Sequence, residues 1–203
     1  MDHFDVHGVT AGVDRALAVV ENPRHRHILK NYRRHGLLEV SGLWEQILVP
    51  EMTVEHPVYR LTENGRRHVL DGMDAVAGFY RGITESRNNV GVLLDEEVGV
   101  SDTGLFSECR MSYVWPGDAP ALAGDDVDPG RCYEVTSWVS MRWPYVGGRL
   151  AGEHVYEDSA SRTVSEVDCS AFTTPEQARE ILAPYLADSP LDELVAGLQL
   201  FTD

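Results

Sequence analysis

The spacing of apolar residues predicts helices at both ends of the chain and strands between them. Apolar residues recur at helical spacing from position 13 to 20, which predicts a first helix that Thr10 could cap. Asn22-Pro23 has the form of a cap followed by the first residue of a second helix, which we expect to continue past Gly36 as far as Ser41. A further short helix is expected from Ser41 through Leu48. Helices at the ends with strands in the middle are typical of an α+β domain.

In the middle of the chain, apolar and polar residues alternate with a period of two, which predicts strands. One strand is expected at Met52–Val58, with His56 on the same face as its apolar neighbours. A loop and an amphipathic helix at Asp71–Arg81 should follow. Longer strands are expected at 90–100, 105–115, 131–145 and 150–158, joined by turns at 101–104 and Gly147-Gly148. We therefore expect one curved antiparallel sheet wrapped around the N-terminal helices, which would form a cone with one pocket.

Two more helices are expected near the C-terminus, because Thr174-Pro175 and Ser189-Pro190 each combine a cap with a proline. The segment 117–130 is rich in Gly, Pro and Asp and is expected to be a flexible rim of the pocket. A chain of 203 residues with 43% apolar content fits a single domain spanning 1–203.

Charge and composition restrict the class of partner. The net charge of −16 repels the phosphates of nucleic acids and of anionic membranes, so neither is an expected partner. The N-terminus lacks the basic start and apolar run of a signal peptide, and no apolar stretch is long enough to span a membrane. These features predict a cytoplasmic protein.

The cysteines and histidines give no support for a metal or a disulfide. Cys109, Cys132 and Cys169 form no CxxC pair and are interpreted as packing residues. His25 and His27 are two apart on a predicted helix and therefore point in different directions. We expect no metal and no cofactor.

The segments LWEQILVPEMTVEHPVYR (43–60) and LDGMDAVAGFYRGI (70–83) resemble the first half of SnoaL-like and ketosteroid isomerase-like proteins of the nuclear transport factor 2-like superfamily. With the hairpins that follow, the resemblance covers residues 24–158 and leaves 159–203 as a C-terminal helical extension. It implies the cone fold. The superfamily includes isomerases, polyketide cyclases, dehydratases, epoxide hydrolases and binding proteins without catalysis, so the resemblance does not specify one reaction.

The resemblance implies two catalytic candidates. His56 occupies the position of the aspartate general base of ketosteroid isomerases, and an imidazole can move a proton near neutral pH. Tyr32 occupies the position of the oxyanion-stabilising tyrosine. Each also has a plain structural interpretation, His56 as a core histidine and Tyr32 as a core aromatic residue.

Further candidates for substrate binding come from position alone. Tyr32, His35 and Glu39 share one helix face and would form either a polar line toward the cavity or a solvated His–Glu pair. Ser140 replaces the acidic second donor of the isomerases, and Trp138 lies on the same face of that strand. His154 and Asp158 resemble in position the polar pocket residues of SnoaL-like cyclases, although an exposed face or a dimer contact would explain them equally well.

The leading hypothesis is cofactor-free acid–base catalysis on a hydrophobic carbonyl compound, of the isomerase, cyclase or dehydratase type, with His56 moving the proton and Tyr32 steadying the oxygen. The alternative is a ligand-binding or assembly protein with the same cone. An epoxide hydrolase needs an Asp-Arg-Asp set that the sequence does not place. The hypotheses differ in one geometric feature: for catalysis by this pair, His56 and Tyr32 must open onto the same cavity.

The predicted sheet also indicates an oligomer. Aromatic residues occur on both faces of its strands, including Tyr113, Tyr133, Trp138 and Trp143. One face would therefore need a cover other than the cone helices, and we expect a homodimer packed through the sheet.

Overall fold

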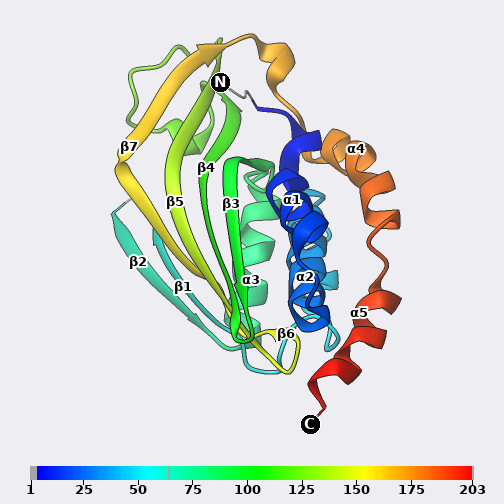
Figure 1. Ribbon diagram of the computed structural model, residues 1–203. Coiled ribbons are helices and arrows are strands. Elements are labelled where there is room, and N and C mark those ends of the chain that lie inside the picture. The colour runs from blue at the N-terminus through cyan, green and yellow to red at the C-terminus, as the bar shows by residue number, and fades with distance from the viewer. Residues whose placement is uncertain (1–3, 64, 203) are drawn as a thin grey trace.

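The computed structural model describes residues 4–63 and 65–202. A curved sheet lies on one side of the molecule, and the helices lie on its concave side (Figure 1). The helices are α1 (Ala11–Val19), α2 (Pro23–Val40), α3 (Met73–Glu85), α4 (Pro175–Ala187) and α5 (Leu191–Gly197). The strands are β1 (Val58–Glu63), β2 (Arg66–Asp71), β3 (Gly91–Ser101), β4 (Gly104–Pro116), β5 (Cys132–Val146), β6 (Arg149–Leu150) and β7 (His154–Val167). The predicted α+β cone is confirmed.

The strand order in the sheet is β2-β1-β7-β5-β4-β3, and the short β6 pairs with the end of β5. The long strands pair antiparallel as expected, β4 with β3 and β5 with β4 and β7. However, β1 runs parallel to β7, with Leu61 opposite Val155. The expectation of a wholly antiparallel sheet is therefore wrong for this pair. The two strands are far apart in sequence, so no hairpin turn dictates their relative direction.

Helix α2 forms the floor of the cone. The Asn22 side chain accepts hydrogen bonds from the backbone N–H groups of Arg24 and His25, and Pro23 fills the first helical position. The helix continues through Gly36 as predicted and ends at Val40. The expected short helix after Ser41 is only a single 3₁₀ turn at Trp44–Gln46.

The strand expected at Met52–Val58 is not formed. Thr53 makes one isolated bridge to Leu150, and the chain then bends until β1 begins at Val58. The segments 60–63 and 65–70, expected to belong to a loop, lie largely in β1 and β2, which pair as a hairpin. Pro57 has no N–H to contribute to a ladder, and its carbonyl instead accepts the N–H of Gly72. As a result, the alternation that was interpreted as strand lies in an irregular segment.

The final long strand and the cysteines also differ from expectation. β7 continues to Val167, well beyond the expected end at Asp158, because its second half pairs with the beginning of β5. This pairing sets Cys132 opposite Val167, and Cys132 forms a disulfide with Cys169. The interpretation of all three cysteines as packing residues is corrected for these two, whereas Cys109 is a buried free thiol.

The C-terminal helices pack against the N-terminal ones. α4 and α5 both contact α2, on the side of the molecule opposite the outer face of the sheet (Figure 1). The Thr174 capping box at the start of α4 confirms the predicted cap. Within the described residues, no helix has the length and apolar character needed to cross a membrane.

Candidate active site

A cavity lies between the helices and the concave face of the sheet, and it has two adjoining compartments. The first, called here the α2 compartment, has a volume of about 70 Å³ and is lined by Tyr32, His35, Trp143 and other residues of α2 and the sheet. The second, called the α3 compartment, has a volume of about 430 Å³ and is lined by Phe79 of α3 and by residues of β1, β4, β5 and β7. Glu39, Met111, Tyr113, Met141 and Glu153 line both.

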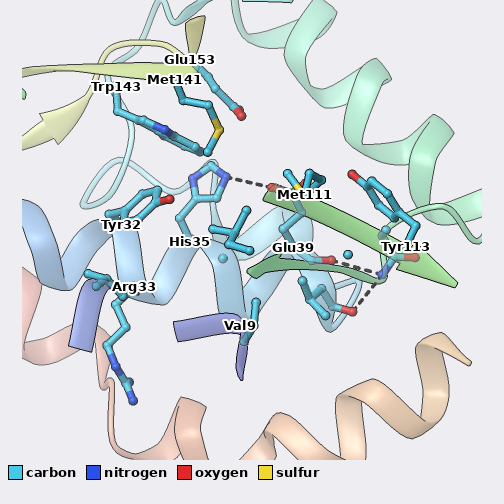
Figure 2. A pocket seen from close by; sticks show the side chains of 16 residues that line it. Val9, Tyr32, Arg33, His35, Glu39, Met111, Tyr113, Met141, Trp143 and Glu153 are labelled. Carbon is cyan, nitrogen blue, oxygen red and sulfur yellow. Dashed lines mark hydrogen bonds and ion pairs between the residues drawn. The ribbon is translucent and has the colours of Figure 1, made fainter. Parts of the chain in front are cut away.

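His35 is a buried polar residue on the wall of the α2 compartment. Only 1% of the residue is exposed, and its imidazole lies beside the indole of Trp143 in an edge contact (Figure 2). Its Nε2 lies 3.2 Å from Glu39 Oε2 and 2.9 Å from the Tyr80 hydroxyl. The Tyr80 hydroxyl is in turn 2.9 Å from that of Tyr59. These contacts fix the orientation of the ring.

Two buried nitrogen atoms beside this cluster lack protein partners. His35 Nδ1 and Trp143 Nε1 have no hydrogen-bond partner among the described residues. Buried polar atoms are normally satisfied, so each such atom at a cavity wall indicates a position where a bound molecule could supply the missing partner.

Glu153 is a carboxyl group held in a largely apolar environment. It follows β6, immediately before β7, and its side chain points toward the same space as His35 and Met141 (Figure 2). Burial raises the pKa of Glu153 well above its ordinary value, and the nearby Glu39 and Glu63 raise it further. The neutral acid is therefore stabilised, and a neutral carboxyl can donate a hydrogen bond or a proton.

Tyr32 lines the α2 compartment, but its hydroxyl is already engaged. It donates to Glu96 Oε1 at 2.5 Å, and its ring makes an edge contact with Trp143. Burial and the adjacent Glu96 both raise the pKa of Tyr32. The expected role as oxyanion donor would require this bond to break, so the structure favours an orienting and packing role for Tyr32.

His56 does not face the cavity, which corrects the expectation drawn from its position in the sequence. Its side chain is 71% exposed, and its Nε2 pairs with Asp71 Oδ1 at 2.7 Å. The ring lies over Gly72, where a Cβ atom would come within 3.2 Å of it. Residues 54–57 are not in a strand. The alternation of side chains between two faces, from which His56 was expected to point inward, is therefore absent there.

Four of the expected binding residues lie on the outer face of the sheet. Trp138 and Ser140 of β5 are exposed, and their partners in the β7 register are Asp158 and Tyr156. His154 pairs with Arg142 on this same face, where burial and the charges of Arg60 and Arg142 lower the pKa of His154. Ser140, Trp138, His154 and Asp158 are thus removed from the candidate site, whereas His35 and Glu39 are retained in it.

The alternation of β5 and β7 was correctly identified, but the wrong face was assigned to the pocket. Met141 pairs with Val155, and both are buried. Glu153 and Glu157, each two residues from Val155 along the chain, therefore point inward as Val155 does. The apolar character of Val155 was the signal available in the sequence. Nothing local to Tyr80 or Tyr59 indicated that their hydroxyl groups would meet His35.

No set of three His, Cys, Asp or Glu side chains in the described ranges is arranged to hold a metal ion. The chemistry that the cavity residues themselves can perform is proton transfer and hydrogen bonding, through an imidazole, carboxyl groups and hydroxyl groups.

Comparison with known proteins gives fold relatives only. No family model matches the sequence, and no curated protein matches it. Among solved structures, the chain is similar to a protein assigned as a SnoaL-like polyketide cyclase from Jannaschia sp. CCS1, with a TM-score of 0.52 and 12% identity over 68% of this chain and 90% of that one. It is also similar to a nuclear transport factor 2-like protein from Anabaena variabilis, with a TM-score of 0.46 and 15% identity over 79% of this chain and 96% of that one.

Proposed function

The chain has the cone fold of SnoaL-like and nuclear transport factor 2-like proteins, and we propose that its cavity catalyses proton transfer on a small, largely apolar carbonyl compound without a cofactor. Polyketide cyclases are among the proteins with this fold. The observation that carries the proposal is His35, a buried imidazole at the cavity wall whose ring is oriented by Glu39 and Tyr80. Buried, oriented titratable groups beside a cavity are typical of acid–base sites.

The proposed roles follow from protonation state. A neutral His35 accepts a proton from the carbon next to the carbonyl group, which leaves negative charge on the carbonyl oxygen. Glu153, kept neutral by its raised pKa, donates a hydrogen bond or its proton to that oxygen. Trp143 Nε1 is a second available donor at the same wall. Returning the proton to a different carbon gives isomerisation, and attack of the carbanion on a second carbonyl carbon gives cyclisation.

A model ketone tests this proposal without knowledge of the natural substrate. The purified chain, incubated with β-tetralone in deuterium oxide, should speed the exchange of the ketone's α-hydrogens above the buffer rate, as followed by NMR. His35→Ala should lower the enzymatic rate by about a hundredfold or more, since general base catalysis typically contributes that much. Glu153→Gln, which retains a hydrogen-bond donor but cannot give up a proton, should also be slower.

His68→Ala, which removes an exposed histidine of β2, is the matched control and should exchange at the wild-type rate. The rate should also fall as pH rises through the raised pKa of Glu153, because the neutral acid is the active form. Loss of exchange in His56→Ala but not in His35→Ala would contradict the assignment.

A binding protein without catalysis is the second candidate. It is favoured by the separation of the two residues expected to act together, because His56 is at the surface and the Tyr32 hydroxyl is bonded to Glu96. A wild-type protein that binds apolar ketones but exchanges their hydrogens no faster than buffer would support this candidate over the enzyme.

A further inference from the structure

The α3 compartment combines acidic groups with aromatic surfaces. Glu39, Glu63, Glu153 and Glu157 all line it, and the cationic side chain on its wall is Arg162. That guanidinium already binds both carboxylate oxygens of Asp125, at 2.9 and 2.8 Å. Glu39 is paired with His35, and Glu157 accepts a hydrogen bond from the Ser137 hydroxyl, so Glu63 and Glu153 are the lining carboxyl groups considered further as ligand partners.

The carboxyl groups are also poorly solvated. Burial raises the pKa of Glu63, and the neighbouring Glu157 and Glu39 raise it further, while Glu153 is shifted in the same direction. Among the described residues, neither Glu63 nor Glu153 has a hydrogen-bond or ion-pair partner on its side chain. A carboxyl group beside an apolar cavity stays protonated unless a positive charge stabilises its ionised form, so a cationic ligand beside Glu63 would lower the pKa of Glu63 again.

Aromatic rings also line the α3 compartment and could contact a bound ligand. Tyr113 and Trp115 are stacked with their centroids 4.8 Å apart, and both line the compartment together with Phe79. Aromatic faces attract organic cations as well as apolar groups. In the adjoining α2 compartment, Trp143 Nε1 and His35 Nδ1 are buried without partners, so the cavity also has polar atoms left for a ligand to satisfy.

We propose that the carbonyl substrate of this cavity also carries an amine or ammonium group, and that this positive group lies beside Glu63 and the aromatic rings of the α3 compartment while Glu153 stays neutral. The inference rests on the proposed function for the location of the site and adds the chemical class of its substrate. The volume and apolar walls accommodate an organic body, and the carboxyl groups are not arranged as metal ligands within the described chain.

Three probes of nearly equal size separate charge from hydrophobic contact: naphthylmethylamine, naphthylmethanol and naphthoate. Binding of each to the full chain is measured by isothermal titration calorimetry. The amine should bind at least about tenfold more tightly than the alcohol, because opposite charges attract strongly at a poorly solvated site, and naphthoate should bind most weakly. Glu63→Gln should reduce the affinity for the amine by about tenfold, while the affinity for the alcohol changes little.

Glu180→Gln, which removes an exposed carboxylate of α4, is the matched control and should bind all three probes as the wild type does. Equal affinities for amine and alcohol, a preference for naphthoate, or no binding of any probe at millimolar concentration would each overturn the inference. The ketone exchange experiment is independent of these outcomes, since β-tetralone is neutral. A protein that prefers the amine but does not exchange ketone hydrogens would retain the cation site and lose the catalytic proposal.

Discussion

Glu96 is a buried carboxyl group, and we expect it to contribute to the pH dependence of the protein's stability. A bulge between Leu94 and Glu97 turns its side chain inward, where it is 2% exposed and accepts a hydrogen bond from Tyr32. Burial raises the pKa of Glu96 from 4.5 to about 7, although the bond from Tyr32 partly opposes the shift. The folded chain therefore retains a proton that the unfolded chain has already lost.

This linkage predicts that stability falls as pH rises from 4.5 to about 7 and that the Glu96 contribution is constant above that window. The full effect is about 3 kcal/mol, since each pKa unit corresponds to about 1.4 kcal/mol. Urea unfolding across this range should show that Glu96→Gln lacks this part of the slope, whereas Glu180→Gln should follow the wild type. Parallel curves for the wild type and Glu96→Gln would show that Glu96 titrates normally in the folded protein.

At the scale of elements, the disulfide fastens the chain after the end of β7 to the beginning of β5. Cys132 and Cys169 are separated by 37 residues, so the bond closes a long loop in the unfolded chain. Loss of the bond should lower the free energy of unfolding by about 4 kcal/mol on a chain-entropy estimate. The melting temperature of the wild type should fall when dithiothreitol is added.

The matched control is the double variant Cys132→Ser/Cys169→Ser, whose melting temperature should not respond to reductant. A thiol assay on the denatured, unreduced wild type should detect the single thiol of Cys109. Detection of three thiols would show that the bond does not form in the purified protein.

The types of element were predictable from periodicity where the chain has long regular segments. They were less predictable where contacts with distant residues determine the backbone conformation. The cap at Asn22-Pro23 and the alternation of β3, β4 and β5 are local signals, and they located these elements correctly. The irregular segment before Val58 also alternates, but it is held by individual bonds to Leu150 and Ala151 rather than by a ladder. Because this segment is not a strand, His56 lies at the surface rather than in the cavity, where it was expected.

The candidate site was less predictable than the fold because its members meet only in three dimensions. Tyr59, Tyr80 and His35 come from β1, α3 and α2, and only their packing brings the three polar groups together. Likewise, alternation showed that Glu153 and His154 point in opposite directions, but the apolar Val155 was the one local signal for the inward face, which the register with Met141 establishes. Sequence spacing can identify which residues share a face, whereas identification of the cavity face needs the neighbouring strand.

At the scale of the whole molecule, the outer face of the sheet carries exposed aromatic residues that the described chain leaves uncovered. Phe106, Trp138 and Tyr156 are 56%, 41% and 53% exposed. Trp138 of β5 and Tyr156 of β7 lie on the outward side of these paired strands. Phe106 of β4 lies opposite Arg142 of β5. The C-terminal helices, which could have covered this face, pack on α2 instead (Figure 1). Large exposed aromatic residues on one face are typical of a protein–protein interface.

We therefore predict a homodimer in which two copies of this sheet pack face to face. Light scattering at micromolar concentration should give the mass of a dimer for the wild type. Trp138→Glu should give a monomer, because it replaces an aromatic contact with a charge in the interface, and a buried unpaired charge is costly. Val19→Glu is the matched control: Val19 is 77% exposed on α1, away from the sheet's outer face, so this variant should remain dimeric. A monomeric wild type under these conditions would show that the exposed aromatic residues serve another contact.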